Sequence, residues 1–399
     1  MVQKEIIDRL YEAASIRRWN DHVRPEEFTE LDKQAHKMII AYVLAMSEGY
    51  RRDRDGVFSW VRLIEGGIFE FLHRVLLTDI KPPVFHRMMA EKGPELNRWV
   101  LEKLKPELEG LPASFTDHFS AYLLDPDFSR TEKRILKAAH YLATNWEFQI
   151  IYSACPYIYG IENTRAEIEN QLEDHYDLKG VQKIWLGKKS FGFVDLCGQL
   201  RFQRRWSQSP RLPETSVLGH MLIVAILTYW CSLELDACSR RLRNNFFAGL
   251  FHDLPEVLTR DITSPVKGAV EGLEDIIKEY ENIQIESRLL PLLPESWHRE
   301  IRYFIQNEFA NRVIVDGEDR TGLTVEEINR DYNRAEAEPV DGKLLRACDH
   351  LAAFIEASKS IDHGVTSKHL EDGKARLLEV YQGRFVSSID FGQLFADFS

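Results

Sequence analysis

The chain has 399 residues, of which 44% are hydrophobic and 11% aromatic, which is enough apolar material for two domains of ordinary size. Its 63 acidic side chains outnumber its 51 basic ones and give a formal net charge of −12. This balance disfavours a long nucleic acid as partner, because polyphosphate backbones need a broad cationic surface, whereas a small anion held by a local arginine or a metal stays open.

No segment predicts export or membrane insertion. The first residues, MVQKEIIDRLYEAAS, alternate charged and apolar side chains and lack the apolar core of a signal peptide. The longest apolar run begins at Met221 and reaches Cys231, short of the roughly 18 residues of a membrane span, so we expect a buried helix. The five cysteines are odd in number and show no CxxC spacing, which is typical of free thiols in a reducing compartment. We therefore expect a cytoplasmic protein.

Helical periodicity dominates the chain. Residues 274–290 and 344–359 carry apolar residues at three- and four-residue spacing, and alternating β-branched residues are scarce. The exception is residues 312–333, where a β-branched run, the turn DGED and a second run favour a small hairpin. The sequence predicts an all-α protein with this one insertion.

Three stretches of the first half recur in the same order in the second half. The matching pairs are residues 15–45 with 202–230, 68–84 with 250–266, and 134–143 with 343–352. The first pair runs in both halves from Arg-Arg-Trp to a histidine that opens an apolar helix, His36 in one half and His220 in the other. The shared order argues against chance similarity and predicts two tandem helical domains, residues 1–190 and 191–399.

The two halves differ in their polar residues. The second half has His252, Asp253, Glu256 and Asp349 where the first half has Glu70, Phe71, Arg74 and His140. A structural role for these side chains would have been useful in both halves, whereas a chemical role can be lost from one copy. We therefore interpret the polar cluster of the second half as chemical.

The residue types of this cluster suit a divalent ion. On a helix, His252, Asp253 and Glu256 would share a face, because residues three and four apart are neighbours. A buried carboxylate such as Asp253 needs a cation, a donor network or a metal. Taken singly, His220 and Asp349 are more typical of hydrogen-bonded core residues. Two imidazoles and two carboxylates together predict a mixed nitrogen and oxygen metal site.

These motifs resemble those of the HD-domain metal-dependent phosphohydrolases, and among them the bacterial HD-type 5′-deoxynucleotidases. The resemblance covers residues 202–359 and rests on four stretches: Arg205-Trp206, ETSVLGH, HDLPEVLTRDITSPVK and RACDHLAAFIEA. It implies removal of phosphate from deoxyribonucleoside 5′-monophosphates with one divalent metal ion, which Mn, Co, Ni, Fe, Zn or Mg could supply. The implied metal ligands are His220, His252, Asp253 and Asp349.

The resemblance also implies roles for residues around the metal. Glu256 would activate the attacking water, and Asp261 would assist near the leaving group or the sugar. Arg205 would grip the phosphate, whose geometry a guanidinium fork matches, and Trp206 would pack on the nucleotide. The implied substrate contacts are Arg205, Trp206, Asp253, Asp261, Thr263, Ser264 and Asp349, with Thr263 and Ser264 on the sugar side.

Two departures from the family pattern leave the substrate open. Arg260 stands where the related enzymes tend to have glycine, which would favour a substrate with more than one phosphate. The insertion at 311–342 is longer than expected and would alter the pocket.

The alternatives are an HD hydrolase of a nucleoside triphosphate or phosphodiester, a nucleotide-binding regulator with little turnover, and an inert scaffold. The related enzymes are commonly homodimers. The first half would therefore be a fused, metal-free copy that supplies the packing surface of a second subunit, and the alternative is that the protein itself forms a homodimer.

Overall fold

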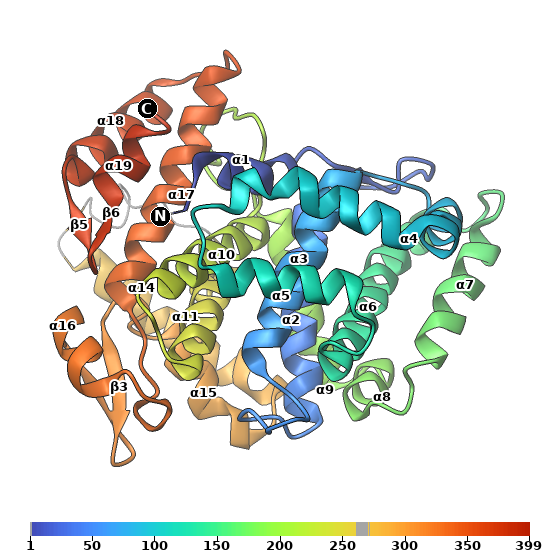
Figure 1. Cartoon of the computed structure of the whole chain (residues 1–399), viewed down its shortest axis with the longest axis horizontal. Coiled ribbons are helices and arrows are strands. Elements are labelled where there is room, and N and C mark those ends of the chain that lie inside the picture. The colour runs from blue at the N-terminus through green and yellow to red at the C-terminus, as the bar shows by residue number, and fades with distance from the viewer. Residues whose placement is uncertain (1, 261–269, 271) are drawn as a thin grey trace. The chain divides into compact units, whose positions relative to one another are not determined.

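The structure, a computed structural model, describes residues 2–260, 270 and 272–399. It is predominantly helical, as predicted (Figure 1). By its internal contacts the chain divides into two compact units. Unit 1 comprises Met1–Gln182, and unit 2 comprises Lys183–Ser399. The strands of the described residues pair only as two-stranded antiparallel ladders, so helix packing forms the core of each unit.

Unit 1 is a helical bundle in which α6 packs against both α2 and α3. A short ladder precedes α2 and places Arg17 opposite Thr29. The side chain of Thr29 then caps α2 by accepting a hydrogen bond from the backbone N–H of Asp32 at 3.2 Å. The elements of unit 1 are α1 (Lys4–Glu12), β1 (Arg17–Arg18), β2 (Phe28–Thr29), α2 (Glu30–Ser47), α3 (Trp60–Leu77), α4 (Pro82–Leu104), η1 (Pro106–Leu108), α5 (Ala113–Leu124), α6 (Arg130–Ala154) and α7 (Ile161–Glu173), with α8 (Lys179–Trp185) running across the boundary.

Unit 2 is built around α10, which packs against α11 and α17, while α17 also packs against α18. Its elements are α9 (Lys189–Gly198), η2 (Gln199–Phe202), α10 (Val217–Glu234), α11 (Ser239–Phe251), α12 (Glu256–Thr259), α14 (Leu273–Gln284), η3 (Ile285–Leu289), η4 (Leu290–Leu292), α15 (Glu295–Ile305), β3 (Arg312–Val315), β4 (Glu318–Thr321), α16 (Val325–Glu327), η5 (Ile328–Tyr332), η6 (Ala335–Ala337), α17 (Gly342–Asp362), α18 (Lys368–Tyr381), β5 (Phe385–Val386), β6 (Ile389–Asp390) and α19 (Phe391–Ala396).

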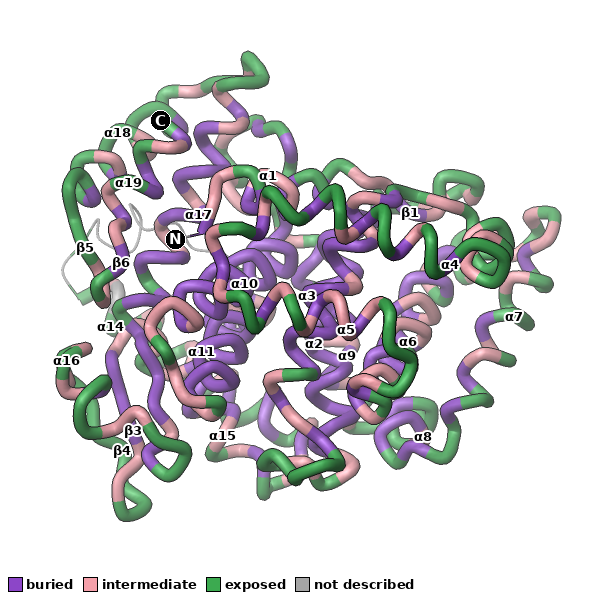
Figure 2. The backbone as a smooth tube through the Cα atoms, in the orientation of Figure 1, coloured by how far each residue is buried: buried purple, intermediate pink, exposed green. Residues whose placement is uncertain are grey.

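Helix α10 forms the centre of the unit 2 core and is buried along nearly all of its length (Figure 2). Ser216 caps its N-terminus by accepting a hydrogen bond from the backbone N–H of Gly219 at 2.9 Å. The buried hydroxyls of Thr228 and Ser232 donate to carbonyls one turn earlier. By length and composition α10 could cross a membrane, but 89% of it is buried within the protein, as the sequence predicted for a core helix.

Gly249 lets α11 approach α10 closely. A Cβ atom on Gly249 would lie 2.7 Å from the Cα atom of Ala225, closer than a side chain tolerates. The two helices therefore touch through their backbones at this level. This contact brings the end of α11, next to His252, towards the first turn of α10, which carries His220.

A buried ionic network fixes the start of α17. Arg241 on α11 is fully buried, and its Nε and Nη2 atoms donate to the carboxylate of Asp341 at 2.6 and 2.7 Å. Asn245 donates to the same carboxylate at 2.7 Å and accepts from the backbone N–H of Asp341 at 2.9 Å. Asp341 directly precedes α17, so the network positions the helix that carries Asp349. Pairing of this kind is what burial of both charges requires.

Strands β3 and β4 form the predicted hairpin, with Arg312 opposite Thr321. The prediction is wrong beyond this point, because residues 325–332 form helical turns. Thr324 and Glu327 begin these turns with a reciprocal capping box, in which each side chain accepts from the backbone N–H of the other residue.

Candidate metal centre

Three predicted metal ligands converge from separate elements of unit 2. His220 is in the first turn of α10, His252 follows α11 directly, and Asp349 lies on α17. The Nε2 atom of His220 is 2.9 Å from Oδ1 of Asp349, and the Nε2 atom of His252 is 3.9 Å from the same oxygen. One potential ligand atom from each residue lies within 4.8 Å of the other two. The spacing is suited to an ion held between the helices.

The fourth predicted ligand, Asp253, joins this group through its neighbour. Its Oδ2 atom lies 3.2 Å from Nε2 of His252 and 3.5 Å from Nη1 of Arg205. The structure thus brings the predicted ligands together with the arginine that was expected to grip phosphate.

The His252-Asp253 pair lies on a turn rather than on the continuous helix that the spacing suggested. Helix α11 ends at Phe251, and α12 begins only at Glu256. Pro255 between them has no N–H to donate, which interrupts the helical ladder. A hydrogen bond of 3.0 Å from the backbone N–H of Glu256 to the carbonyl of Asp253 tightens the turn. Glu256, the predicted base, is 9% exposed at the start of α12.

The imidazole of His252 is oriented for metal binding. Its Nδ1 atom donates to the carbonyl of Gly249 at 2.8 Å, which turns Nε2 towards the carboxylates. That Nε2 atom is buried and faces the carboxylates, 3.2 Å from Oδ2 of Asp253 and 3.9 Å from Oδ1 of Asp349. Burial lowers the pKa of His252, but the carboxylates of Asp253 and Asp349 outweigh it and raise the pKa to about 9. These surroundings favour a positive charge at this position.

Both carboxylates are held in their ionised form. Burial alone would raise the pKa of Asp253, yet His252 and Arg205 hold that pKa well below its usual range. Burial likewise raises the pKa of Asp349, and the hydrogen bond from His220 overcomes it and lowers the pKa. Metal ligands must be deprotonated, so the carboxylates are ready to bind a cation. Two imidazoles and two carboxylates fit a divalent ion.

Glu356, which no sequence-based prediction included, organises the predicted phosphate-binding pair. Its carboxylate is fully buried and accepts hydrogen bonds from Nε1 of Trp206 at 2.9 Å and from Oγ1 of Thr215 at 2.7 Å. The Nε atom of Arg205 donates to it at 3.3 Å, and Nδ1 of His220 lies 3.5 Å away. One buried carboxylate therefore contacts a metal ligand and both members of the Arg-Trp pair.

A sequence signal for Glu356 was present in the internal repeat. Glu356 lies seven residues after Asp349 on the same helix face, and in the first half Glu147 lies seven residues after His140. An acidic residue present in both halves on an apolar helix could have been singled out by extending the third matching stretch by four residues.

Trp206 is held in a defined position. Its backbone has a φ of 56°, in the left-handed region that a bulky residue rarely adopts. A Cβ atom on Gly373 of α18 would lie 2.9 Å from Cη2 of the indole, so the ring edge packs directly on that helix. The indole is fixed at one edge by Glu356 and at the other by α18.

Three predicted site residues, Asp261, Thr263 and Ser264, lie outside the described residues. Arg260 immediately before them has a φ of 65° and a ψ of 162°. Glycine alone adopts this region easily, so the backbone at Arg260 is strained. The glycine that related enzymes tend to carry at this place would avoid the strain.

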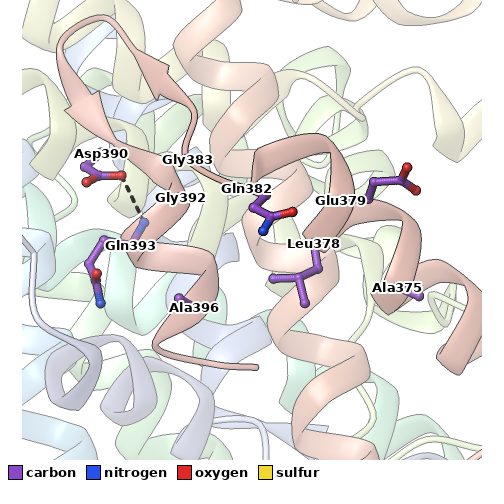
Figure 3. A pocket seen from close by; sticks show the side chains of 9 residues that line it. All are labelled: Ala375, Leu378, Glu379, Gln382, Gly383, Asp390, Gly392, Gln393 and Ala396. Carbon is purple, nitrogen blue, oxygen red and sulfur yellow. Dashed lines mark hydrogen bonds between the residues drawn. The ribbon is translucent and has the colours of Figure 1, made fainter.

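A hollow of about 610 Å³ lies between α18, α19 and the end of β6 (Figure 3). Its lining residues are Ala375, Leu378, Glu379, Gln382, Gly383, Asp390, Gly392, Gln393 and Ala396. None of these is a residue predicted for the site.

Comparisons with known proteins match the part of the chain that carries these residues. A family model described as HD domain matches residues 197–378. A 5′-deoxynucleotidase of Vibrio atlanticus is 30% identical over 209 residues, which make up 51% of this chain and 91% of that protein. A 5′-deoxynucleotidase of Pasteurella multocida is 23% identical over 196 residues, which make up 46% of this chain and 81% of that protein.

A helical unit in which two histidines and two aspartates lie close together is the arrangement expected of a metal-dependent hydrolase. The chain belongs to the HD-domain phosphohydrolase family, and it is a metal-dependent phosphohydrolase. The residues that the family model matches fall within unit 2.

Proposed function

We propose that the protein removes the phosphate of deoxyribonucleoside 5′-monophosphates, with His220, His252, Asp253 and Asp349 as ligands of one divalent ion. The observation that carries this proposal is the 3.5 Å contact between Arg205 and Asp253, which sets a guanidinium beside the ligand group. The indole of Trp206 shares the carboxylate of Glu356 with Arg205. A phosphate monoester needs a cation for its terminal oxygens, and a nucleoside offers an apolar face to an aromatic ring. The names of the relatives support the same substrate class.

The residues of the site divide the chemistry between them. When bound, the ion would lower the pKa of a water molecule and neutralise charge on the phosphoryl oxygens. Arg205 binds the phosphate and stays aligned through its contact with Glu356. Glu256 accepts the proton of the attacking water, because its carboxylate follows the ligand turn directly and is not required as a ligand. As the P–O bond breaks, the leaving oxygen of the sugar takes up a proton. We propose that Asp261 donates this proton.

A nucleotide panel tests the substrate. The protein is stripped of metal, reloaded with single ions, and assayed for phosphate release from ribo- and deoxyribonucleoside mono- and triphosphates and from a phosphodiester. We expect release of inorganic phosphate and nucleoside from 5′-monophosphates, with deoxyribose preferred. Tripolyphosphate or a monophosphate as the product would favour the triphosphate or diester alternative, to which the strained Arg260 contributes extra charge.

The base is tested by Glu256→Gln, which keeps the side-chain shape and removes the carboxylate. We expect turnover to be lost while the metal content is retained. The control is Glu318→Gln, on the exposed strand β4, which should leave both unchanged. If Glu256→Gln retained full activity on every nucleotide of the panel, Glu256 would not be the base.

We also propose a cytoplasmic location, on the ground of the free cysteines and the buried α10.

A further inference from the structure

Unit 1 repeats local features of unit 2 at matching positions. Helices α2 and α10 are both 18 residues long, and each begins after a capping hydroxyl, that of Thr29 in one and Ser216 in the other. Trp19 has a φ of 60° where Trp206 has 56°. Each helix also meets a glycine of the neighbouring helix of its unit, α2 through Met38 with Gly67 and α10 through Ala225 with Gly249. Residues this unusual, recurring in order, indicate that the two units share one arrangement.

The matching helices give the register of the two sites. His220 is the fourth residue of α10, and the fourth residue of α2 is Lys33. Lys33 therefore occupies the position of His220, and His36, the counterpart suggested by the sequence, lies three residues further on. The Nζ atom of Lys33 contacts Nδ1 of His140 on α6, as Nε2 of His220 contacts Asp349 on α17.

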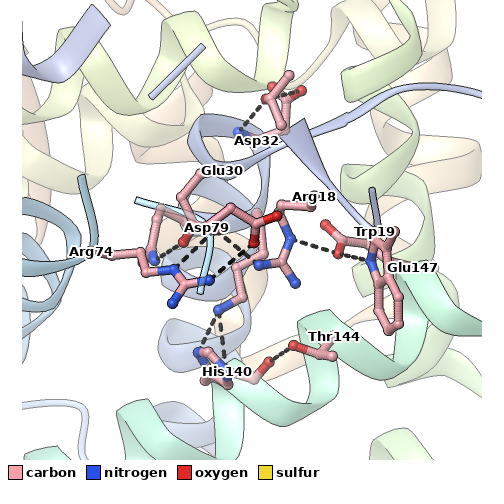
Figure 4. Close-up of polar contacts among 12 residues, drawn as sticks. Arg18, Trp19, Glu30, Asp32, Arg74, Asp79, His140, Thr144 and Glu147 are labelled. Atoms are coloured by element: carbon pink, nitrogen blue, oxygen red, sulfur yellow. Dashed lines mark hydrogen bonds and ion pairs between the residues drawn. The ribbon is translucent and has the colours of Figure 1, made fainter. Parts of the chain in front are cut away.

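The Arg-Trp-Glu arrangement is also present in unit 1 (Figure 4). Glu147 accepts a hydrogen bond from Nε1 of Trp19 at 2.8 Å and from Nε of Arg18 at 2.9 Å. Nη1 of Arg18 donates to Glu30 at 2.9 Å, so the guanidinium that would correspond to Arg205 is paired on two sides by buried carboxylates.

The remaining ligand positions of unit 1 are also occupied or lost. Glu70 corresponds to His252, since each lies eight residues before a strained residue of positive φ, Thr78 in unit 1 and Arg260 in unit 2. The carboxylate of Glu70 accepts from Nζ of Lys37 at 2.7 Å and from the hydroxyl of Tyr122 at 2.6 Å. The residue after it is Phe71, which offers no ligand atom where unit 2 has Asp253.

We propose that the amino group of Lys33 takes the place of the metal ion in unit 1, so that the N-terminal unit is a closed, metal-free copy of the site and each chain binds one ion. Lys33 is fully buried and lies among Glu30, Glu147 and His140. Its side chain fills the space that an ion would need, and the carboxylates around it are already paired with arginine and lysine.

Lys33 excludes the ion mainly because its side chain fills the space, and less because of its charge. Burial, together with Arg18 and Lys37, lowers the pKa of Lys33 well below its ordinary value despite the nearby Glu30. A long side chain in contact with His140 blocks the position in either protonation state.

The stoichiometry of manganese tests this proposal without any substrate. The full-length protein is stripped, reloaded with excess Mn²⁺, desalted and analysed for metal per chain. We expect one equivalent for the native protein and close to none for Asp349→Asn, which removes a ligand in unit 2. Two equivalents in the native protein, or one remaining in Asp349→Asn, would place an ion in unit 1 and overturn the proposal. Neither result depends on which nucleotide the enzyme hydrolyses.

A second variant tests the role of Lys33 directly. Lys33→His restores an imidazole at the matched position, beside His140 and Glu70. We expect a second equivalent of Mn²⁺ and a rise in melting temperature on adding it. The control is Lys37→His, a neighbouring buried lysine at a position without a ligand in unit 2, which should stay at one equivalent. A folded Lys33→His protein that still bound one equivalent would show that Lys33 does not exclude the ion. If Lys33→His failed to fold, the native and Asp349→Asn stoichiometries would decide.

Discussion

The indole N–H of Trp206 donates a 2.9 Å hydrogen bond to Glu356, although 150 residues separate the two in sequence. Because Glu356 also accepts from Arg205, one carboxylate aligns the two side chains that we expect to hold the nucleotide. Its negative charge is secured by Arg211 and Arg205, which outweigh burial and keep the pKa of Glu356 well below its usual range.

We therefore expect Glu356→Gln to weaken substrate binding more than turnover. The charge-assisted bonds that it removes are worth about 1.5–3 kcal/mol, which corresponds to a fall in kcat/KM of roughly 10- to 100-fold. Most of the fall should appear in KM, and the metal content should be unchanged. Steady-state kinetics and metal analysis of the purified variant measure both.

The N-terminal unit supplies the control for this variant. Glu147 makes the same two contacts with Arg18 and Trp19, so Glu147→Gln should cost stability without changing KM. An equal rise in KM for both variants would mean that Glu356 acts only through the stability of the fold.

The fixed ring of Trp206 leads to a second prediction. Gly373→Ala would place a methyl group 2.9 Å from Cη2 of the indole, and the helix α18 cannot easily withdraw. The ring should shift, and KM for nucleotides should rise several-fold while metal binding stays intact. The matched control is Gly364→Ala, near the end of α17, where the added atom meets nothing within 4 Å, although its positive φ costs some stability. An unchanged KM in folded Gly373→Ala would show that the position of the ring does not limit binding.

Arg260 and Thr78 share a strained backbone conformation, with φ values of 65° and 61°. Such a conformation costs about 1–3 kcal/mol for a residue other than glycine. Glycine has more conformational entropy in the unfolded chain, which reduces the stability gained by the substitution by about 0.5–1 kcal/mol. We expect Arg260→Gly and Thr78→Gly each to raise the free energy of unfolding by about 1 kcal/mol. Urea titrations measure the change.

Activity separates these two variants. If Arg260 contributes charge to the substrate site, Arg260→Gly should lower the ratio of triphosphate to monophosphate hydrolysis, whereas Thr78→Gly should leave it unchanged. A loss of stability in both variants would show that side-chain contacts outweigh backbone strain.

The sequence predicted the parts of the fold and site that depend on local pattern. Helix α10 followed from its apolar run, and the group of residues that we propose as ligands followed from the His-Asp pair and its distant partners. Pro255 is a sequence signal for a break in the helix, but the four-residue spacing of His252 and Glu256 suggested that both lie on one face of a continuous helix. Lys33 can be matched to the position of His220 only when the first residues of α2 and α10 are known. A shift of three residues leaves a helical pattern almost unchanged, so the sequence alone suggested His36. The role of Glu356 depends on side chains 141 and 150 residues away, which no local pattern connects.

Acid should destabilise the protein through Glu30. Burial on its own raises the pKa of this carboxyl group, but the guanidinium groups of Arg18 and Arg74 counter burial and help to lower the pKa to about 2 from 4.5. A carboxylate with a depressed pKa stabilises the folded state above the unfolded pKa, and the contribution disappears as the pH falls towards the folded value. The shift corresponds to about 3 kcal/mol at neutral pH, lost between about pH 4.5 and 2. The difference in unfolding free energy between native protein and Glu30→Gln should therefore be largest near pH 7 and shrink steadily below pH 4.5. A difference that stayed constant down to pH 3, measured by urea titration at fixed ionic strength, would show that Glu30 stabilises unit 1 through packing and not through its charge.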